Sequence, residues 1–314
     1  MTFYKTIKPW IDNVLNRVGG VLKEAIFPTQ CLVCKSFFQV GIHGCEKLKI
    51  LLGWLKNFDP DTMIPLKWAN NNFMSADQPN NYQGNFHKIF SMLMSPFLCT
   101  NCSATFLPVE SPICLKCGII FKSRQGEDRV CGDCIKAPKK YEMARSAGVY
   151  DQALMSAIHC LKYKGKIQLA RPLGVLLLMA FCRYWYKKRI DIITPVPLHG
   201  KKLRIRGFNP SFLLVRSWPR IFEMLNGQLP VIPVEKDILA RKKWTSPQTG
   251  LGRKERLENI KNAFVINDAS KIEGKKILLV DDVYTTGATA NECAKVLLKG
   301  GSRQVDVLTL ARAV

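Results

Sequence analysis

Residues 277–289 are Ile277-Leu278-Leu279-Val280-Asp281-Asp282-Val283-Tyr284-Thr285-Thr286-Gly287-Ala288-Thr289. The first four residues are apolar and predict a short buried strand. Two adjacent carboxylates stand at its carboxyl end, and a loop rich in threonine and glycine leads into a predicted helix over residues 288–299. A strand, a polar loop and a helix in this order indicate an α/β fold, in which ligands bind outside the carboxyl ends of the strands.

The loop has the chemistry of a sugar-phosphate site. Backbone N–H groups, hydroxyls and a helix N-terminus attract a phosphate, and a glycine without a Cβ lets the backbone approach it. The two carboxylates can accept hydrogen bonds from two ribose hydroxyls. We predict a ribose 5-phosphate site formed by Asp281, Asp282, Thr285, Thr286, Gly287, Ala288 and Thr289. The simpler alternative is a strand end followed by a capped helix. A Walker A loop is excluded, because no Gly-Lys-Ser/Thr ends this loop.

The rest of the C-terminal half repeats the alternation of strand and helix. Apolar runs predict strands over residues 190–196, 277–280 and 304–311, and helical periodicity predicts helices over residues 151–163, 168–186, 208–225 and 288–299. This alternation indicates a parallel sheet with helices on its faces. We assign residues 141–314 to this α/β domain. Residues 1–27 predict an amphipathic basic helix, packed on the protein body or lying on a membrane surface or partner.

The cysteine spacing predicts metal binding. Eight of the 12 cysteines form four Cys-x-x-Cys pairs, a spacing that lets both thiolates face one tetrahedral zinc ion. We predict structural zinc at two quartets: Cys31, Cys34, Cys99 and Cys102, and Cys114, Cys117, Cys131 and Cys134. Residues 28–140 then form a zinc-ribbon module with an insertion over residues 35–98, in which residues 44–58 predict a helix and residues 70–85 a mobile loop. The insertion leaves open whether the first quartet shares one ion. The remaining Cys45, Cys160, Cys182 and Cys293 are predicted to be small core residues.

The charge of the chain favours anionic partners. The formal net charge is +23, and residues 183–261 hold 18 Lys/Arg against 6 Asp/Glu. Solubility alone or binding of polyphosphate or nucleic acid would explain this stretch. We predict a pyrophosphate-binding basic loop after the strand over residues 190–196, formed by Leu198, His199, Lys201, Lys202, Arg204 and Arg206. Phe208 and Trp218 are expected in the core, whereas Trp244 is left open as a surface on which a base could stack. Residues 244–254 predict a mobile loop that closes over an anionic ligand.

Composition also bears on localisation. The most apolar run, residues 173–181, is shorter than the roughly 20 residues that span a bilayer, and no secretory signal is evident. We expect a cytoplasmic protein, where reduced thiols suit zinc better than disulfides.

Residues 277–289 resemble the 5-phosphoribosyl-1-pyrophosphate motif of type I phosphoribosyltransferases. The resemblance implies that Asp281 and Asp282 contact the ribose hydroxyls, that the loop through Ala288 holds the 5-phosphate, and that Mg²⁺ accompanies the ligand. Further motifs occur in order: Ile158-His159-Cys160-Leu161-Lys162-Tyr163-Lys164-Gly165, Pro195-Val196-Pro197-Leu198-His199, Arg206-Gly207-Phe208-Asn209 and Gln248-Thr249-Gly250-Leu251. With the zinc module, the pattern resembles the ComF family of competence proteins.

The resemblance implies a role in natural transformation, in which the protein handles incoming single-stranded DNA at the cytoplasmic face of the inner membrane. It also implies helicase-like and DNA-processing partners. Two features depart from the family pattern. Pro210 replaces the usual glutamine after Asn209 and suits the first turn of a helix, and the insertion over residues 35–98 is unusual.

Three functions remain open on the sequence. The first is a DNA-handling competence protein that binds phosphoribosyl pyrophosphate. The second is an active phosphoribosyltransferase with an unknown acceptor, and the third is a scaffold with a relict site. The complete phosphate motif argues against the third. Residue 2 is threonine, so the nucleophilic cysteine expected of a glutaminase domain is lacking.

Overall fold

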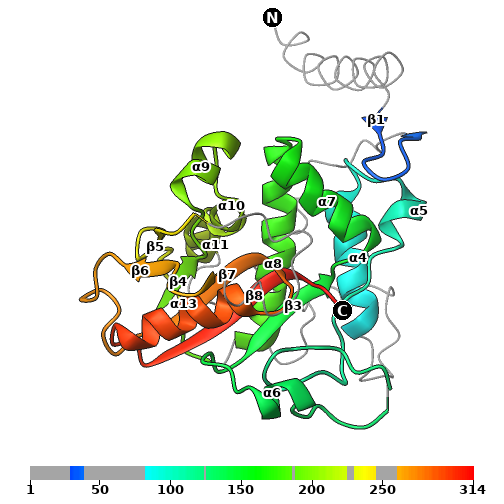
Figure 1. Cartoon of the computed structure of the whole chain (residues 1–314). Helices are drawn as coiled ribbons and strands as arrows, with labels where there is room; N and C mark the ends of the chain where they lie inside the picture. Colours follow the sequence, from blue (N-terminus) through cyan, green and yellow to red (C-terminus); the bar gives the residue numbers. More distant parts are fainter. Residues whose placement is uncertain (1–28, 39–81, 124, 186–187, 225–229, 245–259) are drawn as a thin grey trace, which may run out of the picture.

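A four-stranded parallel sheet lies at the centre of the computed structural model, which describes residues 29–38, 82–123, 125–185, 188–224, 230–244 and 260–314 (Figure 1). The strands are β3 (Ala144–Val149), β8 (Gln304–Arg312), β7 (Lys276–Tyr284) and β4 (Ile192–Pro195), in this order across the sheet. Each strand pairs in parallel with its neighbour. The predicted parallel sheet is confirmed.

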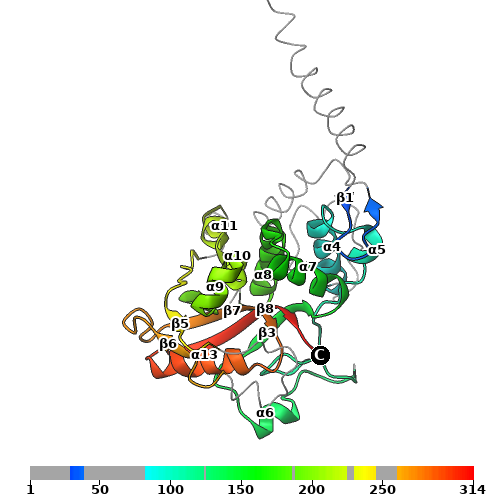
Figure 2. The ribbon, with the colours of Figure 1, turned by 45° about the horizontal axis from the view of Figure 1, so that its top comes forward.

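Helices cover both faces of the sheet, as Figure 2 shows. One face carries α8 (Ala170–Trp185) and α10 (Pro210–Val215), and the other carries α13 (Ala288–Lys299). The core divides in the same way, since Leu278 and Val280 pack in the cluster that contains α8. Ile277 and Leu279 pack in the cluster that contains α13. Because neighbouring residues of a strand face opposite sides, an unbroken apolar run is what a sheet buried on both faces requires.

Several elements differ from the sequence prediction. The helix predicted over residues 208–225 is two short helices, α10 and α11 (Trp218–Met224), with a turn at residues 216 and 217. The chain is interrupted where Pro219 enters the first turn of α11, because a proline ring cannot continue a helix that precedes it. β7 continues past Val280 to Tyr284, so both carboxylates belong to the strand and do not follow it.

Other elements were not predicted. They include β3, the basic helix α9 (Gly200–Arg206), and the antiparallel pair β5 (Leu239–Arg241) and β6 (Phe264–Ile266). The helix predicted over residues 168–186 begins as a short 3₁₀ turn, η1 (Ile167–Leu169), and continues as α8. The predicted helix over residues 151–163 corresponds to α7 (Gln152–Tyr163), which leads from β3 toward α8. Pro210 stands in the first turn of α10, where the side chain of Asn209 caps the helix.

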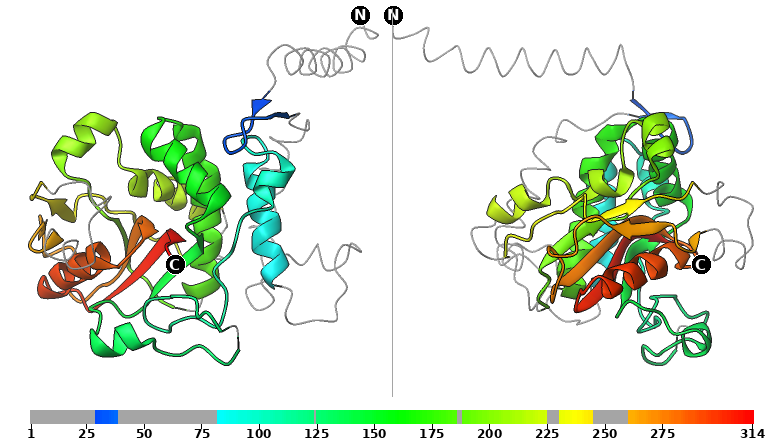
Figure 3. Two further views of the ribbon diagram at one scale, coloured as in Figure 1. Left: turned by 45° about the vertical axis from the view of Figure 1, so that its right-hand side comes forward. Right: turned by 60° about the vertical axis from the view of Figure 1, so that its left-hand side comes forward.

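The cysteine-rich part contributes to the same core as the sheet. It comprises β1 (Thr29–Gln30), β2 (Phe37–Phe38), α4 (Tyr82–Met94), α5 (Thr100–Ser103) and α6 (Gly132–Lys136). Helix α4 runs alongside α8, and Ile89 and Phe90 are buried in the core that both helices share (Figure 3). The end of the insertion is therefore a core helix, and residues 82–85 of the predicted loop belong to it. The helices predicted over residues 1–27 and 44–58, residues 70–81 of that loop, and Cys45, lie outside the described residues.

One helical segment meets the length and composition of a membrane span. It runs over Ile167–Trp185, and 72% of its most apolar window is buried inside the protein. The segment packs on the sheet, α4 and α10. This burial is consistent with the core helix of a soluble protein.

The contact of α8 with α10 depends on Gly174. A Cβ atom at this position would overlap the carbonyl oxygen of Leu214, which is backbone and cannot swing aside. We expect Gly174→Ala to lower the free energy of unfolding by about 1–3 kcal/mol, as overpacking does. Urea unfolding checks this. Gly200→Ala is the matched control, because among the described residues its Cβ has only the tip of Arg204 within 4 Å. Equal stability of both variants would contradict the expectation.

Candidate functional site

A cavity of about 360 Å³ opens at the carboxyl ends of β4 and β7. These two strands are neighbours, with Pro195 opposite Val280, and the N–H of Val196 donates to the carbonyl oxygen of Val280 at 2.8 Å. The loops that follow the two strands are therefore held side by side. Among the residues lining the cavity are Asp281, Asp282, Thr285, Gly287, Ala288 and Thr289 from the predicted phosphate site.

The loop after β7 is shaped to expose backbone N–H groups. Gly287 has φ +75° and occupies the N-cap position of α13 without a side-chain cap. A Cβ at Gly287 would overlap the hydroxyl of Tyr284, so glycine is required on grounds of both space and conformation. The N–H of Ala288 donates a long hydrogen bond of 3.4 Å to the Thr286 hydroxyl oxygen. The uncapped start of a helix is a favourable place for a phosphate.

The two carboxylates are held by different partners. Asp281 Oδ1 accepts hydrogen bonds from the hydroxyl of Ser211 and the N–H of Asp282, both at 2.9 Å. Asp282 Oδ1 forms an ion pair with Lys162 Nζ at 2.7 Å, in which both side chains are largely buried. Burial would lower the pKa of Lys162, but Asp282 outweighs it and raises this pKa. The carboxylates therefore stand fixed inside the cavity, where a diol could bridge them.

Burial and the neighbouring Asp282 raise the pKa of Asp281 to about 7. A pKa above the unfolded value means that the native state holds this proton more tightly. The stabilisation is complete below the unfolded pKa of about 3.9 and is lost as pH rises through 7. We expect Asp281→Asn, which never ionises, to gain stability relative to the wild type between pH 5 and pH 8.

Urea unfolding at several pH values checks this expectation. Asp191→Asn is the control, since a hydrogen bond from the Lys276 N–H lowers the pKa of Asp191. The stability that Asp191 contributes is lost only as pH falls into the acid range, so this variant should show no trend between pH 5 and pH 8. A constant difference between Asp281→Asn and the wild type over this range would contradict the account.

The basic loop divides between the cavity and the outer surface. Leu198, Lys202 and Arg206 line the cavity, whereas Lys201 and Arg204 do not. His199 caps α9 by accepting from the N–H of Lys201. Burial lowers the pKa of Lys202, and the charges of Arg241 and Arg206 lower it further. These cations raise one another's energy, so an anionic ligand would be attracted to this side of the cavity.

Two aromatic residues near the cavity are paired with cations of α9. The guanidinium of Arg206 lies 5.1 Å from the ring centroid of Tyr163, and Lys201 Nζ lies 5.7 Å from that of Trp244. Tyr163 is 66% exposed and Trp244 is 42% exposed. Trp244, whose role the sequence left open, is thus a surface residue. Its ring forms a T-shaped contact with the ring of His199, with the two ring centroids 5.1 Å apart. Trp218, by contrast, is fully buried.

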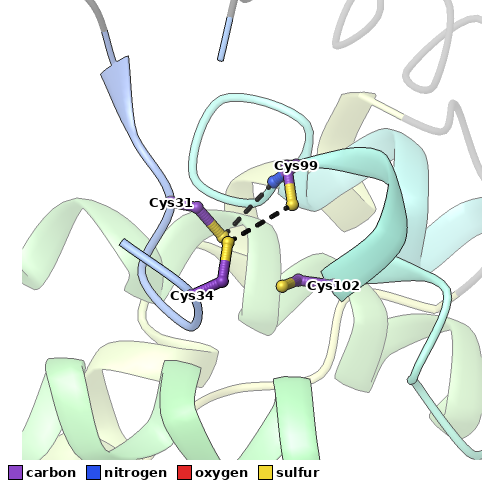
Figure 4. Close-up of side chains that lie close together, drawn as sticks. All are labelled: Cys31, Cys34, Cys99 and Cys102. Carbon is purple, nitrogen blue, oxygen red and sulfur yellow. Dashed lines mark hydrogen bonds between the residues drawn. The ribbon is translucent and has the colours of Figure 1, made fainter. Parts of the chain in front are cut away.

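Both cysteine quartets gather into compact clusters. Within each quartet the sulfur atoms all lie within 4.8 Å of one another. We call Cys31, Cys34, Cys99 and Cys102 the outer cluster (Figure 4) and Cys114, Cys117, Cys131 and Cys134 the inner cluster. The insertion therefore does not separate the members of the outer quartet. The sulfur atoms of Cys34 and Cys99 are 3.8 Å apart, as are those of Cys117 and Cys131.

These distances fit zinc. A tetrahedron with Zn–S bonds of about 2.3 Å has sulfur–sulfur edges of about 3.8 Å. The N–H groups of Cys117 and Cys131 point at Cys114 Sγ from 3.4 and 3.3 Å. Burial acts to raise the pKa of Cys114, but these N–H groups lower it to about 7. Each cluster could therefore hold a structural zinc ion with four thiolates. Cys160, Cys182 and Cys293 are buried core residues, as predicted.

Sequence reasoning missed several residues of the cavity. Lys162 appeared only within a family motif, and Tyr150, Ser211, Arg241 and Thr309 were not singled out as site residues. These residues are far from the phosphate loop in the chain, on or beside α7, α10, β5 and β8. Of these residues, only Lys162 had a recognisable place in the sequence pattern. It lies in the last turn of α7, a helix predicted from its periodicity, shortly before Gly165.

The chain is similar in sequence to known proteins. The phosphoribosyl transferase domain family matches residues 223–313. Competence protein F of Haemophilus influenzae is 32% identical over 220 residues, which cover 69% of this chain and 90% of that protein. DNA utilization protein YhgH of Escherichia coli is 30% identical over 220 residues, 69% of this chain and 91% of that protein. Competence protein ComFC of Bacillus subtilis is 26% identical over 223 residues, 69% of this chain and 84% of that protein.

The fold, the cavity and these matches define a protein with a phosphoribosyltransferase domain joined to a cysteine-rich module. The chain belongs to the ComF family of competence proteins.

Proposed function

We propose that the protein binds phosphoribosyl pyrophosphate with Mg²⁺ and acts in DNA uptake by handling single-stranded DNA. One observation carries the proposal. A phosphate loop, two fixed carboxylates and a set of cations line the same cavity. A phosphate, a ribose diol and a pyrophosphate joined in one molecule would satisfy all three. The relatives named for competence and DNA utilization support the role in DNA uptake.

Each part of the ligand has a counterpart in the cavity. The backbone of residues 285–289 would take the 5-phosphate, and Asp281 and Asp282 would accept hydrogen bonds from the ribose hydroxyls. Lys202 and Arg206 would face the pyrophosphate, since cations of α9 line that side. Mg²⁺ prefers oxygen ligands and keeps phosphate oxygens among them, so it would be held mainly by the pyrophosphate.

The surface beside the cavity suits a nucleic-acid strand. Helix α9 carries Lys201, Lys202, Arg204 and Arg206 and no acidic residue. Two of these cations lie outside the cavity, and exposed aromatic rings stand next to the helix. Cations that track phosphates and rings on which bases stack, at about 1–3 kcal/mol per base, are the usual elements of single-strand binding.

This proposal includes a cytoplasmic location, with the inner-membrane surface as the alternative place of work. It also includes helicase-like and DNA-processing proteins as partners. Both follow from the competence role. A second candidate is transfer of the phosphoribosyl group to an acceptor. It is favoured by the complete set of acids and cations in the cavity, because such groups would stabilise a departing pyrophosphate.

Fluorescence anisotropy with a labelled oligothymidine tests the DNA part of the proposal. We expect the binding constant to fall with salt, and Lys201→Ala/Arg204→Ala to reduce the log–log slope by about 1.4, or 0.7 per cation. Lys271→Ala/Lys299→Ala, two exposed lysines distant from α9 in sequence, is the control. Binding without salt dependence would refute the DNA role. Pyrophosphate release on adding candidate acceptors would favour the transferase.

A further inference from the structure

We propose that Arg312 and Tyr284 couple the inner cluster to the phosphate loop, so that zinc in this cluster raises the affinity of the cavity for a sugar 5-phosphate. The inference rests on the proposed function. Both residues act as positioning residues, since they lie between the cysteines and the loop.

Two buried arginines contact the inner cluster near Cys117. Arg312, at the end of β8, is 4% exposed, donates to the carbonyl oxygen of Cys117, and places Nη2 3.5 Å from Cys117 Sγ. Arg145 on β3 is 7% exposed and donates to the carbonyl oxygen of Leu115 at 3.0 Å. In the described part of the chain, the Nε atoms of both arginines lack a hydrogen-bond partner. Each guanidinium stays charged when buried.

The charge of a zinc-loaded cluster would balance these arginines. Four thiolates and one Zn²⁺ carry two net negative charges, which matches two guanidinium groups. Asp128 and Asp306 also act on Arg145, whereas no carboxylate among the described residues forms an ion pair with Arg312. Zinc would fix the position of Cys117, whose sulfur and carbonyl oxygen both contact Arg312, so loss of zinc would leave this arginine without a fixed partner. The guanidinium would then be free to shift together with the cysteine that it contacts.

Tyr284 lies between Arg312 and the phosphate loop and contacts both. The guanidinium lies over the Tyr284 ring, 4.4 Å from its centroid. The Tyr284 hydroxyl is hydrogen-bonded to the hydroxyl of Tyr141, whose side chain packs with the inner cysteines. The same hydroxyl occupies the space that a Cβ of Gly287 would need. Tyr284 thus supports the loop at its left-handed residue, so a shift of Arg312 would move the N–H groups that face the phosphate.

The outer cluster provides a natural comparison. It lies at the far side of α7 and α8, next to α4 and α5 (Figure 1). Its polar contacts within the described residues are local, such as the N–H of Cys99 to Cys31 Sγ at 3.5 Å. Across the described ranges, no hydrogen bond joins this cluster to the phosphate loop. Loss of zinc there should leave the cavity unchanged.

The experiment measures coupling in both directions on the full chain. Cys34→Ser removes the exposed ligand of the outer cluster and leaves one zinc, in the inner cluster. In this background, calorimetry gives the Kd for phosphoribosyl pyrophosphate with Mg²⁺ before and after Cys131→Ser, which removes the inner zinc. Competition with a chromogenic chelator then gives the zinc affinity with and without saturating ligand. Arg312→Lys keeps a positive charge but loses the planar fork that spans the cysteine and the ring.

We expect Cys131→Ser to raise the Kd about tenfold, within the usual range of allosteric coupling. Ligand should raise the zinc affinity by the same factor, because coupling free energies are reciprocal. In Arg312→Lys that factor should fall to about one while zinc remains bound. If the wild type does not bind phosphoribosyl pyrophosphate, both the proposed function and the coupling fail. If the wild type binds the ligand but the ligand does not change the zinc affinity, only the coupling is refuted. The same conclusion follows if the ligand still raises the zinc affinity in Arg312→Lys. Neither result depends on whether Cys131→Ser folds.

Discussion

Replacing Asp281 and Asp282 together by asparagine is expected to raise the Kd for phosphoribosyl pyrophosphate at least about a hundredfold. Hydrogen bonds to charged groups contribute about 1.5–3 kcal/mol each, and each 1.4 kcal/mol is tenfold in affinity. Both carboxylates line the cavity and are fixed by neighbours, Asp281 by Ser211 and Asp282 by Lys162. An amide keeps the shape of each side chain but removes its charge and one acceptor. Isothermal titration calorimetry measures the effect.

The control for this variant is Asp268→Asn, which alters an exposed carboxylate that bonds within its own turn, to Ser270. Its Kd should equal that of the wild type. Thermal unfolding of the double variant should show a folded protein, because the amide oxygen introduced at position 281 can still accept hydrogen bonds from the Ser211 hydroxyl and the N–H of residue 282. Unchanged affinity in the folded double variant would mean that the sugar does not bind at these carboxylates.

Disrupting the inner cluster is expected to have the largest effect on stability. Cys114→Ser should lower the zinc content from two ions to one and reduce Tm by about 10 °C, since an uncompensated buried charge costs about 3–5 kcal/mol. Cys114 is fully buried, and its sulfur accepts hydrogen bonds from two N–H groups. The buried Arg145 and Arg312 donate to backbone carbonyl oxygens of the residues that follow it, Leu115 and Cys117. Elemental analysis and differential scanning calorimetry measure both quantities.

Cys34→Ser is the matched control. It also removes one ligand, and therefore one zinc, but Cys34 is exposed and the described residues place no buried arginine on the outer cluster. Its Tm should fall by less than that of Cys114→Ser. Equal losses in the two variants, or a zinc content of one in the wild type, would contradict the charge balance on which this expectation rests.

Regular patterns made the central part of the fold predictable. The apolar run of residues 277–280 had to be a strand buried on both faces, and helix periodicity gave α7, α8 and α13 close to their observed bounds. Cysteine spacing gave both clusters, because two-residue spacing suits a tetrahedral ion whatever the fold around it.

The elements that escaped prediction lack such patterns. β3 is Ala-Arg-Ser-Ala-Gly-Val, with one β-branched residue, and its strand character comes from pairing with β8. Its small residues are explained by packing, since a Cβ at Gly148 would collide with the side chains of Phe106 and Leu154. Neither contact could be inferred from the local sequence.

The basic loop shows why adjacency in sequence does not define a site. The sequence grouped Lys201, Lys202, Arg204 and Arg206 as one cluster, but they lie on a helix. Residues four apart share a helix face, so Lys202 and Arg206 reach the cavity together while Lys201 turns to Trp244. The missing cations, Lys162 and Arg241, come from other elements, which only the folded chain brings near.

The most direct test of the sugar-phosphate site is a crystal structure of the protein with phosphoribosyl pyrophosphate and Mg²⁺. We expect the 5-phosphate within hydrogen-bond distance of backbone N–H groups of residues 285–289. We expect the ribose hydroxyls on Asp281 and Asp282, and the pyrophosphate beside Lys202 and Arg206. A ligand bound elsewhere, or bound in this cavity with its 5-phosphate away from the loop, would contradict it.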